Sequence, residues 1–98
     1  MAWDEKTISA VWEKGTRTSD SANWRKDQCG AWISRSEYGN RNSIYGWEID
    51  HITAKANDGK DILSNLRPLQ WQNNCCKQDG RLVTVVTSDG NKNIEVKK

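Results

Sequence analysis

Hydrophobic and polar residues alternate most clearly in the middle of the chain. Large and polar residues follow one another from Trp47 to Ile52, which is the period of a strand with one buried face. Residues 65–70 form a second extended stretch, and Pro68 favours an edge strand because proline cannot donate a ladder hydrogen bond. Between them, residues 57–61 have the polar, glycine-containing composition of a loop. The pattern therefore predicts two short strands joined by a loop.

A helix and a hairpin are predicted to follow these strands. Residues 71–79 permit two turns of helix, and the glycine that comes next is placed to end it. Val and Thr dominate residues 82–87, as in a strand, and the Asp89-Gly90 turn separates them from a second alternating run. These features predict a terminal β-hairpin over residues 82–96.

The first half of the chain has weaker patterns. In the N-terminal segment 1–24, hydrophobic residues recur at helical spacing from Ile8 to Trp12, and Gly15 is placed to end a short helix. Residues 29–46 are rich in Gly, Ser and Asn, which favours irregular structure packed by aromatic side chains. We therefore expect a single α+β domain over 1–98, with an irregular, aromatic-rich N-terminal part, a strand–strand–helix unit and a C-terminal β-hairpin.

Composition limits the class of protein. Ninety-eight residues are enough for one small domain, and no apolar run reaches the roughly 18–20 residues of a membrane span. The N-terminus lacks the basic-then-apolar order of a signal peptide, so we expect a cytoplasmic protein, either a monomer or a weak dimer. A net charge of +2 neither indicates nor excludes a nucleic-acid partner, because the location of the charges matters more than their sum.

Cysteine and histidine are scarce. Of the three Cys, two are adjacent, so the spacing gives neither a disulfide framework nor a Cys-x-x-Cys zinc pair. We expect reduced thiols and no structural zinc, since a four-ligand zinc site would need all three cysteines together with His51. His51 is the one histidine of the sequence, so any chemistry that needs an imidazole must use it.

Polar residues with chemical potential gather in the predicted strand–strand–helix unit. Asp50 offers a carboxylate oxygen and Asn74 an amide oxygen, which are the hard ligands that Mg²⁺ prefers. His51 is a candidate general base, because imidazole suits proton transfer near neutral pH. Adjacent strand residues point to opposite faces, so Asp50 and His51 can share a site only if the strand ends or bulges there. Each residue taken singly also has an ordinary structural interpretation.

Three stretches occur in a fixed order: Glu48-x-Asp50-His51-Ile52, Asn65-Leu66-x-x-Leu69 and Asn73-Asn74-x-x-Lys77. Together they resemble the His-Asn-His (HNH) endonuclease motif, whose fold is a ββα-metal finger. The resemblance covers residues 47–79, about a third of the chain. The upstream stretch from Arg25 to Ile33, with Tyr45-Gly46-Trp47, is also similar to small stand-alone bacterial members of this family.

The resemblance implies a metal-dependent endonuclease that hydrolyses DNA phosphodiester bonds. It makes His51 the general base, Asn65 the residue that orders the loop, and Asp50 and Asn74 the ligands of one divalent ion, Mg²⁺ or Mn²⁺. Asn73 competes with Asn74 for the second ligand position, and the spacing from Asn65 favours Asn74. Four basic residues near the motif are expected to contact the DNA backbone: Lys77, Arg67, Lys55 and Arg81.

This chain departs from the family pattern at three points. The final His is replaced by Asn74, the usual Pro by Ala54, and the Cys pairs that hold a structural zinc in many members are missing, so the aromatic core is expected to replace that cross-link. Two alternatives stay open. One is a nucleic-acid-binding module with an HNH-like fold that does not cleave. The other is a small interaction domain in which strand 82–87 offers a pairing edge.

Overall fold

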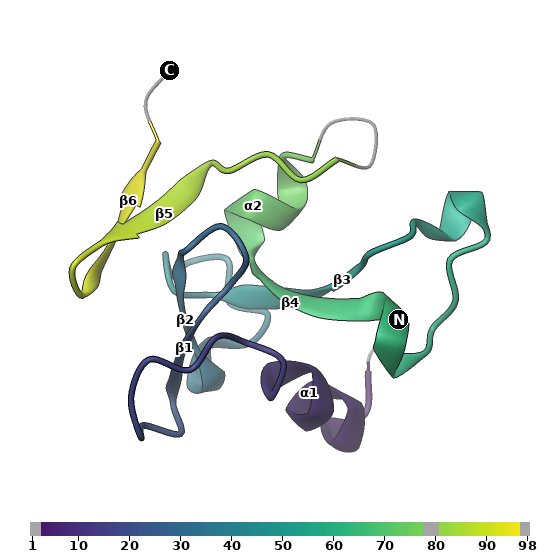
Figure 1. Cartoon of the computed structure of the whole chain (residues 1–98), viewed down its shortest axis with the longest axis horizontal. Coiled ribbons are helices and arrows are strands. Elements are labelled where there is room, and N and C mark those ends of the chain that lie inside the picture. Colours follow the sequence, from purple (N-terminus) through teal and green to yellow (C-terminus); the bar gives the residue numbers. More distant parts are fainter. Residues whose placement is uncertain (1–2, 78–80, 97–98) are drawn as a thin grey trace.

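Three antiparallel strand pairs and two short helices make up the protein (Figure 1). The structure is a computed structural model, and it describes residues 3–77 and 81–96. The helices are α1 (Glu5–Trp12) and α2 (Trp71–Cys75), and the strands are β1 (Trp24–Lys26), β2 (Trp32–Ser34), β3 (Trp47–His51), β4 (Leu66–Gln70), β5 (Val86–Asp89) and β6 (Lys92–Glu95). Within these residues, no helix has the length and apolar surface that crossing a membrane requires.

Helix α1 carries the apolar positions that the sequence places at helical spacing. Its N-cap is Asp4, whose Oδ1 accepts a hydrogen bond from the Thr7 backbone N–H over 2.8 Å. This cap explains why the helix begins before the first apolar residue, at Glu5. The buried side chains of α1 then face one side of the β3–β4 hairpin, and the predicted N-terminal helix is confirmed.

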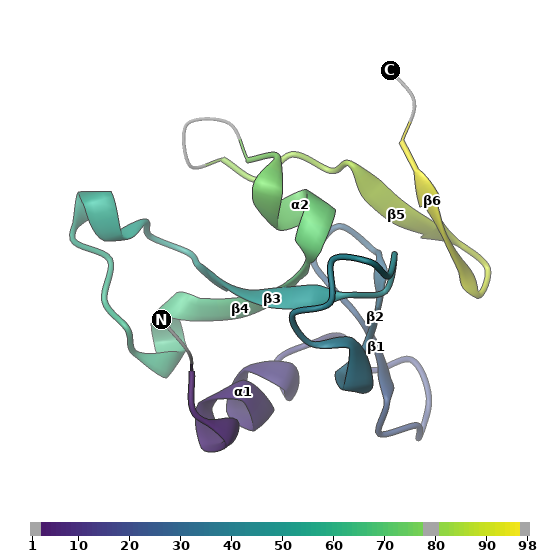
Figure 2. The same ribbon diagram turned by 180° about the vertical axis from the view of Figure 1, so that it is seen from behind.

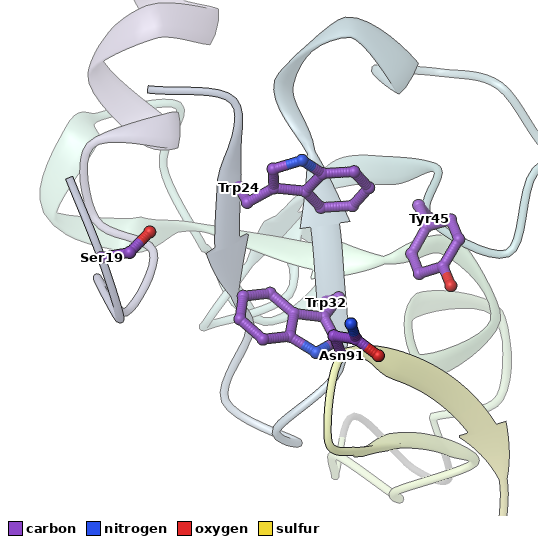
Figure 3. Close-up of a pocket in the computed structure, with 5 residues that line it drawn as sticks. All are labelled: Ser19, Trp24, Trp32, Tyr45 and Asn91. Carbon is purple, nitrogen blue, oxygen red and sulfur yellow. The ribbon is translucent and has the colours of Figure 1, made fainter. Parts of the chain in front are cut away.

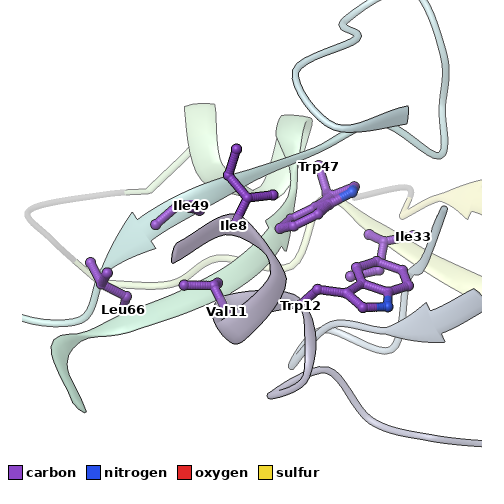
Figure 4. Close-up of a cluster of buried hydrophobic side chains, with 7 residues drawn as sticks. All are labelled: Ile8, Val11, Trp12, Ile33, Trp47, Ile49 and Leu66. Atoms are coloured by element: carbon purple, nitrogen blue, oxygen red, sulfur yellow. The ribbon is translucent and has the colours of Figure 1, made fainter. Parts of the chain in front are cut away.

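The hydrophobic core lies between α1 and this hairpin (Figure 4). Trp12 and Trp47 are at its centre, with ring centroids 5.1 Å apart, and Tyr38 contacts Trp47 at 4.9 Å. Burying side chains of this size contributes about 1.5–3 kcal/mol each, which is a large share of the stability of so small a domain. The remaining members of the cluster are aliphatic: Ile8, Val11, Ile33, Ile49 and Leu66.

Strands β3 and β4 pair without interruption. The register runs from Trp47 opposite Gln70 to His51 opposite Leu66, with one residue facing one residue throughout. Strand β3 ends at His51, as one of the two expected alternatives requires, but it has no bulge, and regular pairing through His51 leaves Asp50 and His51 on opposite faces. The residues alternate as in any strand: Trp47 packs in the core beside α1, whereas Glu48 contacts α2. Helices α1 and α2 thus cover opposite faces of the hairpin (Figures 1 and 2).

Helix α2 is shorter than the sequence predicts. Gln70 caps it through Oε1, which accepts from the N–H groups of Gln72 and Asn73 over 2.9 and 3.2 Å. The helix ends at Cys75, so Lys77 lies beyond it, and the predicted continuation to residue 79 is wrong as far as Lys77. Two asparagines in five residues weaken the helix, because their side chains favour caps and turns. The predicted end at Gly80 lies outside the described residues.

The hairpin formed by β1 and β2 is missing from the sequence-based prediction. Each strand has three residues, and the pairs run from Trp24 opposite Ser34 to Lys26 opposite Trp32. The prediction of irregular structure over 29–46 is therefore wrong for β2, although a loop with one turn of 3₁₀ helix follows. Strands this short contain too little alternation to be recognised.

The terminal hairpin forms, but it begins later than predicted. Strand β5 starts at Val86, which is buried, so the extended strand expected from residue 82 is wrong at its N-terminal end. Gly90 has φ +65° and occupies the first of two turn positions, as a type II′ hairpin turn requires. The strand expected to offer a pairing edge is therefore shorter than the sequence indicates, and it pairs with β6 on one side.

A buried polar cluster joins three distant parts of the chain. The Asp27 carboxylate accepts four hydrogen bonds of 2.9–3.0 Å, from the backbone N–H groups of Cys29, Ala31 and Gln70 and from the Asn73 amide. This polar cross-link lies beside the aromatic core that is expected to replace a zinc staple. The three cysteines are free, with Cys75 and Cys76 exposed.

Candidate metal and nucleic-acid site

The Asp50 carboxylate lies buried between two cations. It is 3% exposed, and its Oδ2 accepts a hydrogen bond from Arg67 Nε over 2.7 Å. Lys77 Nζ contacts the other carboxylate oxygen, Oδ1. Regular β structure turns Asp50 toward α2, and the segment after α2 brings Lys77 back over it. A buried carboxylate needs partners of opposite charge, and here Arg67 and Lys77, two of the four predicted phosphate contacts, supply them.

Asn74 lies on the same side of β3 and contacts a different carboxylate. Its Nδ2 donates to Glu48 Oε1 over 2.8 Å, and Arg41 donates to both oxygens of Glu48 over 2.6 and 2.9 Å. Burial alone would raise the pKa of Glu48, but the hydrogen bonds from Arg41 and Asn74 outweigh burial and lower it. Glu48 is part of the motif, yet the sequence gives it no role. Its contact with Asn74 depends on the register of β3, so sequence spacing does not reveal it.

The oxygen donors on this side of β3 suit a hard divalent ion. Asp50 and Glu48 project from the same face of the strand, and Asn74 faces them from α2. No hydrogen bond joins Asp50 to Asn74 in the described chain, and these residues contain no cluster of three or more His, Cys, Asp or Glu that would hold a metal ion. An ion bound to Asp50 would have to compete with Lys77 for the same oxygen.

The structure separates Asn74 from its rival Asn73. The Asn73 side chain is fully buried, and its Oδ1 accepts from the N–H groups of Val85 and Val86, both over 2.8 Å. Its Nδ2 donates to Asp27 and to the Val86 carbonyl, both over 3.0 Å. With four hydrogen bonds inside the protein, Asn73 is a structural residue, which leaves Asn74 as the candidate ligand.

His51 is the last residue of β3, and it points to the face opposite Asp50. Its Nε2 lies 2.6 Å from Asp61 Oδ1, and its ring centroid is 5.7 Å from that of Trp3. Lys55 contacts the second oxygen of Asp61 over 3.1 Å. Hydrogen bonds from His51 and then from Lys55 lower the pKa of Asp61. Asp61 is a functional candidate that the sequence motif does not identify, although it is an acidic residue in the loop that follows the one histidine.

Asn65 holds that loop in place. Its Oδ1 accepts from the Thr53 N–H over 2.8 Å, and its Nδ2 donates to the carbonyls of Thr53 and Lys60 over 3.0 and 2.9 Å. Gly59 lies so close to Thr53 that a Cβ atom at this position would come within 1.7 Å of the carbonyl oxygen. These contacts hold the loop that carries Asp61 in one conformation. Asp61 needs such a fixed position if it is to orient His51.

The four predicted phosphate contacts are dispersed. Arg67 and Lys77 form ion pairs with Asp50, Lys55 forms one with Asp61, and Arg81 is exposed. Arg67 also donates to Gln28 Oε1 over 2.8 Å. A cavity of about 250 Å³ beside Arg67 adds Lys14 and Lys26, which sequence reasoning missed because both lie far from the motif in the chain. These lysines extend the basic surface from Asp50 toward β1.

The candidate site therefore has two parts on opposite faces of one strand. On the α2 side, Asp50 and Glu48 are bonded to basic side chains and Asn74 donates to Glu48, and on the other side Asp61 holds His51. The assignment to the HNH family rests on the sequence motif and remains a prediction. No protein-family model, curated protein or solved structure matches this chain.

Proposed function

We propose that the chain is a metal-dependent nuclease that hydrolyses phosphodiester bonds in DNA at the end of the β3–β4 hairpin. The observation that carries this proposal is the imidazole of His51, which is held by the Asp61 carboxylate over 2.6 Å and follows the candidate ligand Asp50 in the motif. A hydrogen bond that orients the imidazole is one of the features expected of a general base.

Asp61 determines which nitrogen of His51 can act. Because Nε2 lies against Asp61 Oδ1, a proton on Nε2 leaves Nδ1 as the nitrogen that can remove a proton from water. The lowered pKa of Asp61 keeps its carboxylate ionised at neutral pH, where it stabilises the imidazolium that forms. Lys55, on the other oxygen of Asp61, lies close enough to this pair to contact the phosphate backbone of a bound strand.

Asp50 and Asn74 would hold the divalent ion, with Glu48 beside them. When bound, such an ion offsets the charge that develops on the phosphate oxygens. Lys77 then leaves Asp50 and pairs with a phosphate, so that the site exchanges one cation for another. Because their side chains lie on opposite faces, Asp50 and His51 could contact the same phosphate only around the loop end of the hairpin, beyond the His51–Leu66 pair. The substrate strand must therefore cross the hairpin at that end.

Supercoiled plasmid provides the test. Wild-type protein should nick or cut it with Mg²⁺ or Mn²⁺ and leave it intact with excess EDTA. His51→Ala should still bind Mn²⁺ but lose cleavage, whereas Asp50→Ala should lose both Mn²⁺ binding and cleavage. Lys92→Ala, an exposed site on β6, is the control and should cleave normally. Intact plasmid with every metal for the wild type, or tight Mn²⁺ binding by Asp50→Ala, would overturn the assignment.

A second candidate is a nucleic-acid-binding module that does not cleave. The observation that favours it is the neutralisation of Asp50 by Arg67 and Lys77, which leaves no net negative charge for an ion at that residue. In this case the protein binds DNA equally well in EDTA and in Mg²⁺, and Mn²⁺ titration in the presence of DNA shows no bound ion. Cleavage that depends on His51 would exclude the module.

A further inference from the structure

A second site lies away from the candidate metal ligands, on the β1–β2 hairpin. It is a cavity of about 480 Å³ that three aromatic rings line together with Ser19 and Asn91 (Figure 3). Trp24 meets Trp32 edge to face, with centroids 6.4 Å apart, and meets Tyr45 in the same way at 5.2 Å. Trp24 is 37% exposed, although its indole ring is one of the largest apolar side-chain groups. Three aromatic side chains around one open cavity form a stacking surface for a planar ligand.

The walls of this aromatic pocket are held in position. Trp32 Nε1 donates to the Gly90 carbonyl over 2.8 Å, which fixes its ring against the β5–β6 turn. The Asn93 side chain accepts from the Trp32 N–H over 2.6 Å and donates to the Trp32 carbonyl over 2.8 Å. Trp24 sits on the paired strand β1. A ligand would therefore order few side chains on binding, which lowers the entropic cost of association.

Aromatic pockets bind either cations or planar rings, and the charge around this pocket indicates which of the two it suits. The five side chains that line the pocket are uncharged, and Lys26 Nζ lies 4.8 Å from the centroid of Trp32. No carboxylate forms an ion pair with Lys26 among the described residues. A quaternary ammonium ion would meet this positive charge unfavourably. A ligand that combines an aromatic ring with an anionic group matches both the rings and the lysine.

We propose that the aromatic pocket binds an unpaired nucleobase of a single-stranded nucleic acid, with Lys26 on the adjoining phosphate. Lys26 also lines the basic cavity that contains Lys14 and Arg67, and Arg67 contacts Asp50. Basic side chains thus lie between the pocket and the candidate metal ligands. Stacking does not discriminate between bases, so the pocket supplies affinity for single strands rather than sequence specificity. This inference goes beyond the proposed cleavage and does not depend on it.

Binding in EDTA tests the pocket without any cleavage. Fluorescence anisotropy compares a short labelled oligothymidylate with an abasic strand of the same length, which has the same phosphates and no bases. The wild type should bind the oligothymidylate about tenfold more tightly, since stacking one base contributes on the order of 1–3 kcal/mol. Trp24→Ala should remove this preference, and Trp24→Phe should keep most of it. Ile94→Ala, an exposed apolar residue on β6, is the control and should bind like the wild type.

Two further measurements complete the test. Lys26→Gln should weaken binding of both strands and lower the slope of log K against log salt by about one unit. The indole N–H of Trp32 should stay protected from hydrogen exchange in Trp24→Ala, because its hydrogen bond to the Gly90 carbonyl is kept, and this shows that the pocket wall is intact. Equal affinity of the wild type for the two strands would overturn the proposal. So would displacement of the oligothymidylate by tetramethylammonium but not by thymidine monophosphate.

Discussion

Asn73 donates a hydrogen bond to Asp27 over 3.0 Å, although 46 residues separate them in the sequence. Both side chains are buried, and together they join the β1–β2 hairpin, α2 and β5. Small domains often obtain this kind of cross-link from a metal or a disulfide. Here it consists of one carboxylate and one amide, each with four hydrogen bonds.

Replacing Asp27 should therefore destabilise the whole domain. Asp27→Ala leaves four N–H groups, three of them buried, without this acceptor, and each buried group costs on the order of 1–3 kcal/mol. We expect a loss of at least about 3 kcal/mol in the free energy of unfolding, measured by urea denaturation. Asp20→Ala, an exposed aspartate in the preceding loop, is the control and should change stability little. A small effect of Asp27→Ala would show that the cluster does not hold the fold together.

Lys77 should control the affinity for a metal ion. Lys77→Met keeps roughly the length of the side chain but removes the ammonium group that pairs with Asp50. The variant should therefore bind Mn²⁺ at least about tenfold more tightly than the wild type. Electron paramagnetic resonance of free Mn²⁺ during titration measures this directly. Lys92→Met on β6 should leave the affinity unchanged. If Lys77→Met binds no better than the wild type, Asp50 is not the ligand.

Glu48 should make stability depend on pH in acid. Its pKa lies below the ordinary value of 4.5 in the folded protein, so the ionised carboxylate stabilises the fold fully above pH 4.5. That contribution is lost as the pH falls through the folded pKa. The wild type should accordingly lose its advantage over Glu48→Gln below pH 4.5, as measured by thermal unfolding at several pH values. Arg41→Met removes two of the hydrogen bonds to Glu48, and in that background the pH dependence should be weaker.

Asp61 should affect turnover more than folding. Asp61→Asn keeps the size of the side chain but removes the charge beside His51, so we expect plasmid cleavage to slow by about tenfold to a hundredfold with Tm unchanged. Lys55→Ala is the matched control because Lys55 contacts the other oxygen of Asp61. That variant should raise KM for DNA and leave kcat nearly unchanged. If Asp61→Asn and Lys55→Ala lower kcat equally, Asp61 serves only to position Lys55 and does not act on His51.

The sequence predicts the parts of the fold that local pattern controls. Period-two alternation identifies β3, Pro68 correctly marks an edge strand, and the spacing of apolar residues identifies α1. Two elements escape such reasoning. The strand expected from residue 82 is delayed because Asn73 binds the backbone at Val85 and Val86, and the β1–β2 hairpin is held partly by Asp27. Both depend on contacts between distant residues.

The candidate site divides in the same way. The order of the motif proposes Asp50, His51 and Asn74 as candidates, and it associates Asn65 with the loop that Asn65 is found to bind. The partners of these residues are invisible in the sequence. Asp61 reaches His51 through the path of a loop, and Glu48 reaches Asn74 through the register of β3 against α2. Neither the path nor the register follows from spacing alone.

Within the described residues, strands β5 and β6 form their own two-stranded sheet, and side chains such as Asn73 and Asn93 attach it to the rest of the fold. Opening of this hairpin would break those attachments but none of its own strand hydrogen bonds. Opening would carry away Asn91 and the Gly90 carbonyl that holds Trp32. A ligand that binds only while the β5–β6 hairpin is in place stabilises this closed state, so opening of the hairpin becomes rarer. Amide hydrogen exchange in β5 and β6 thus becomes a direct readout of whether the aromatic pocket is filled.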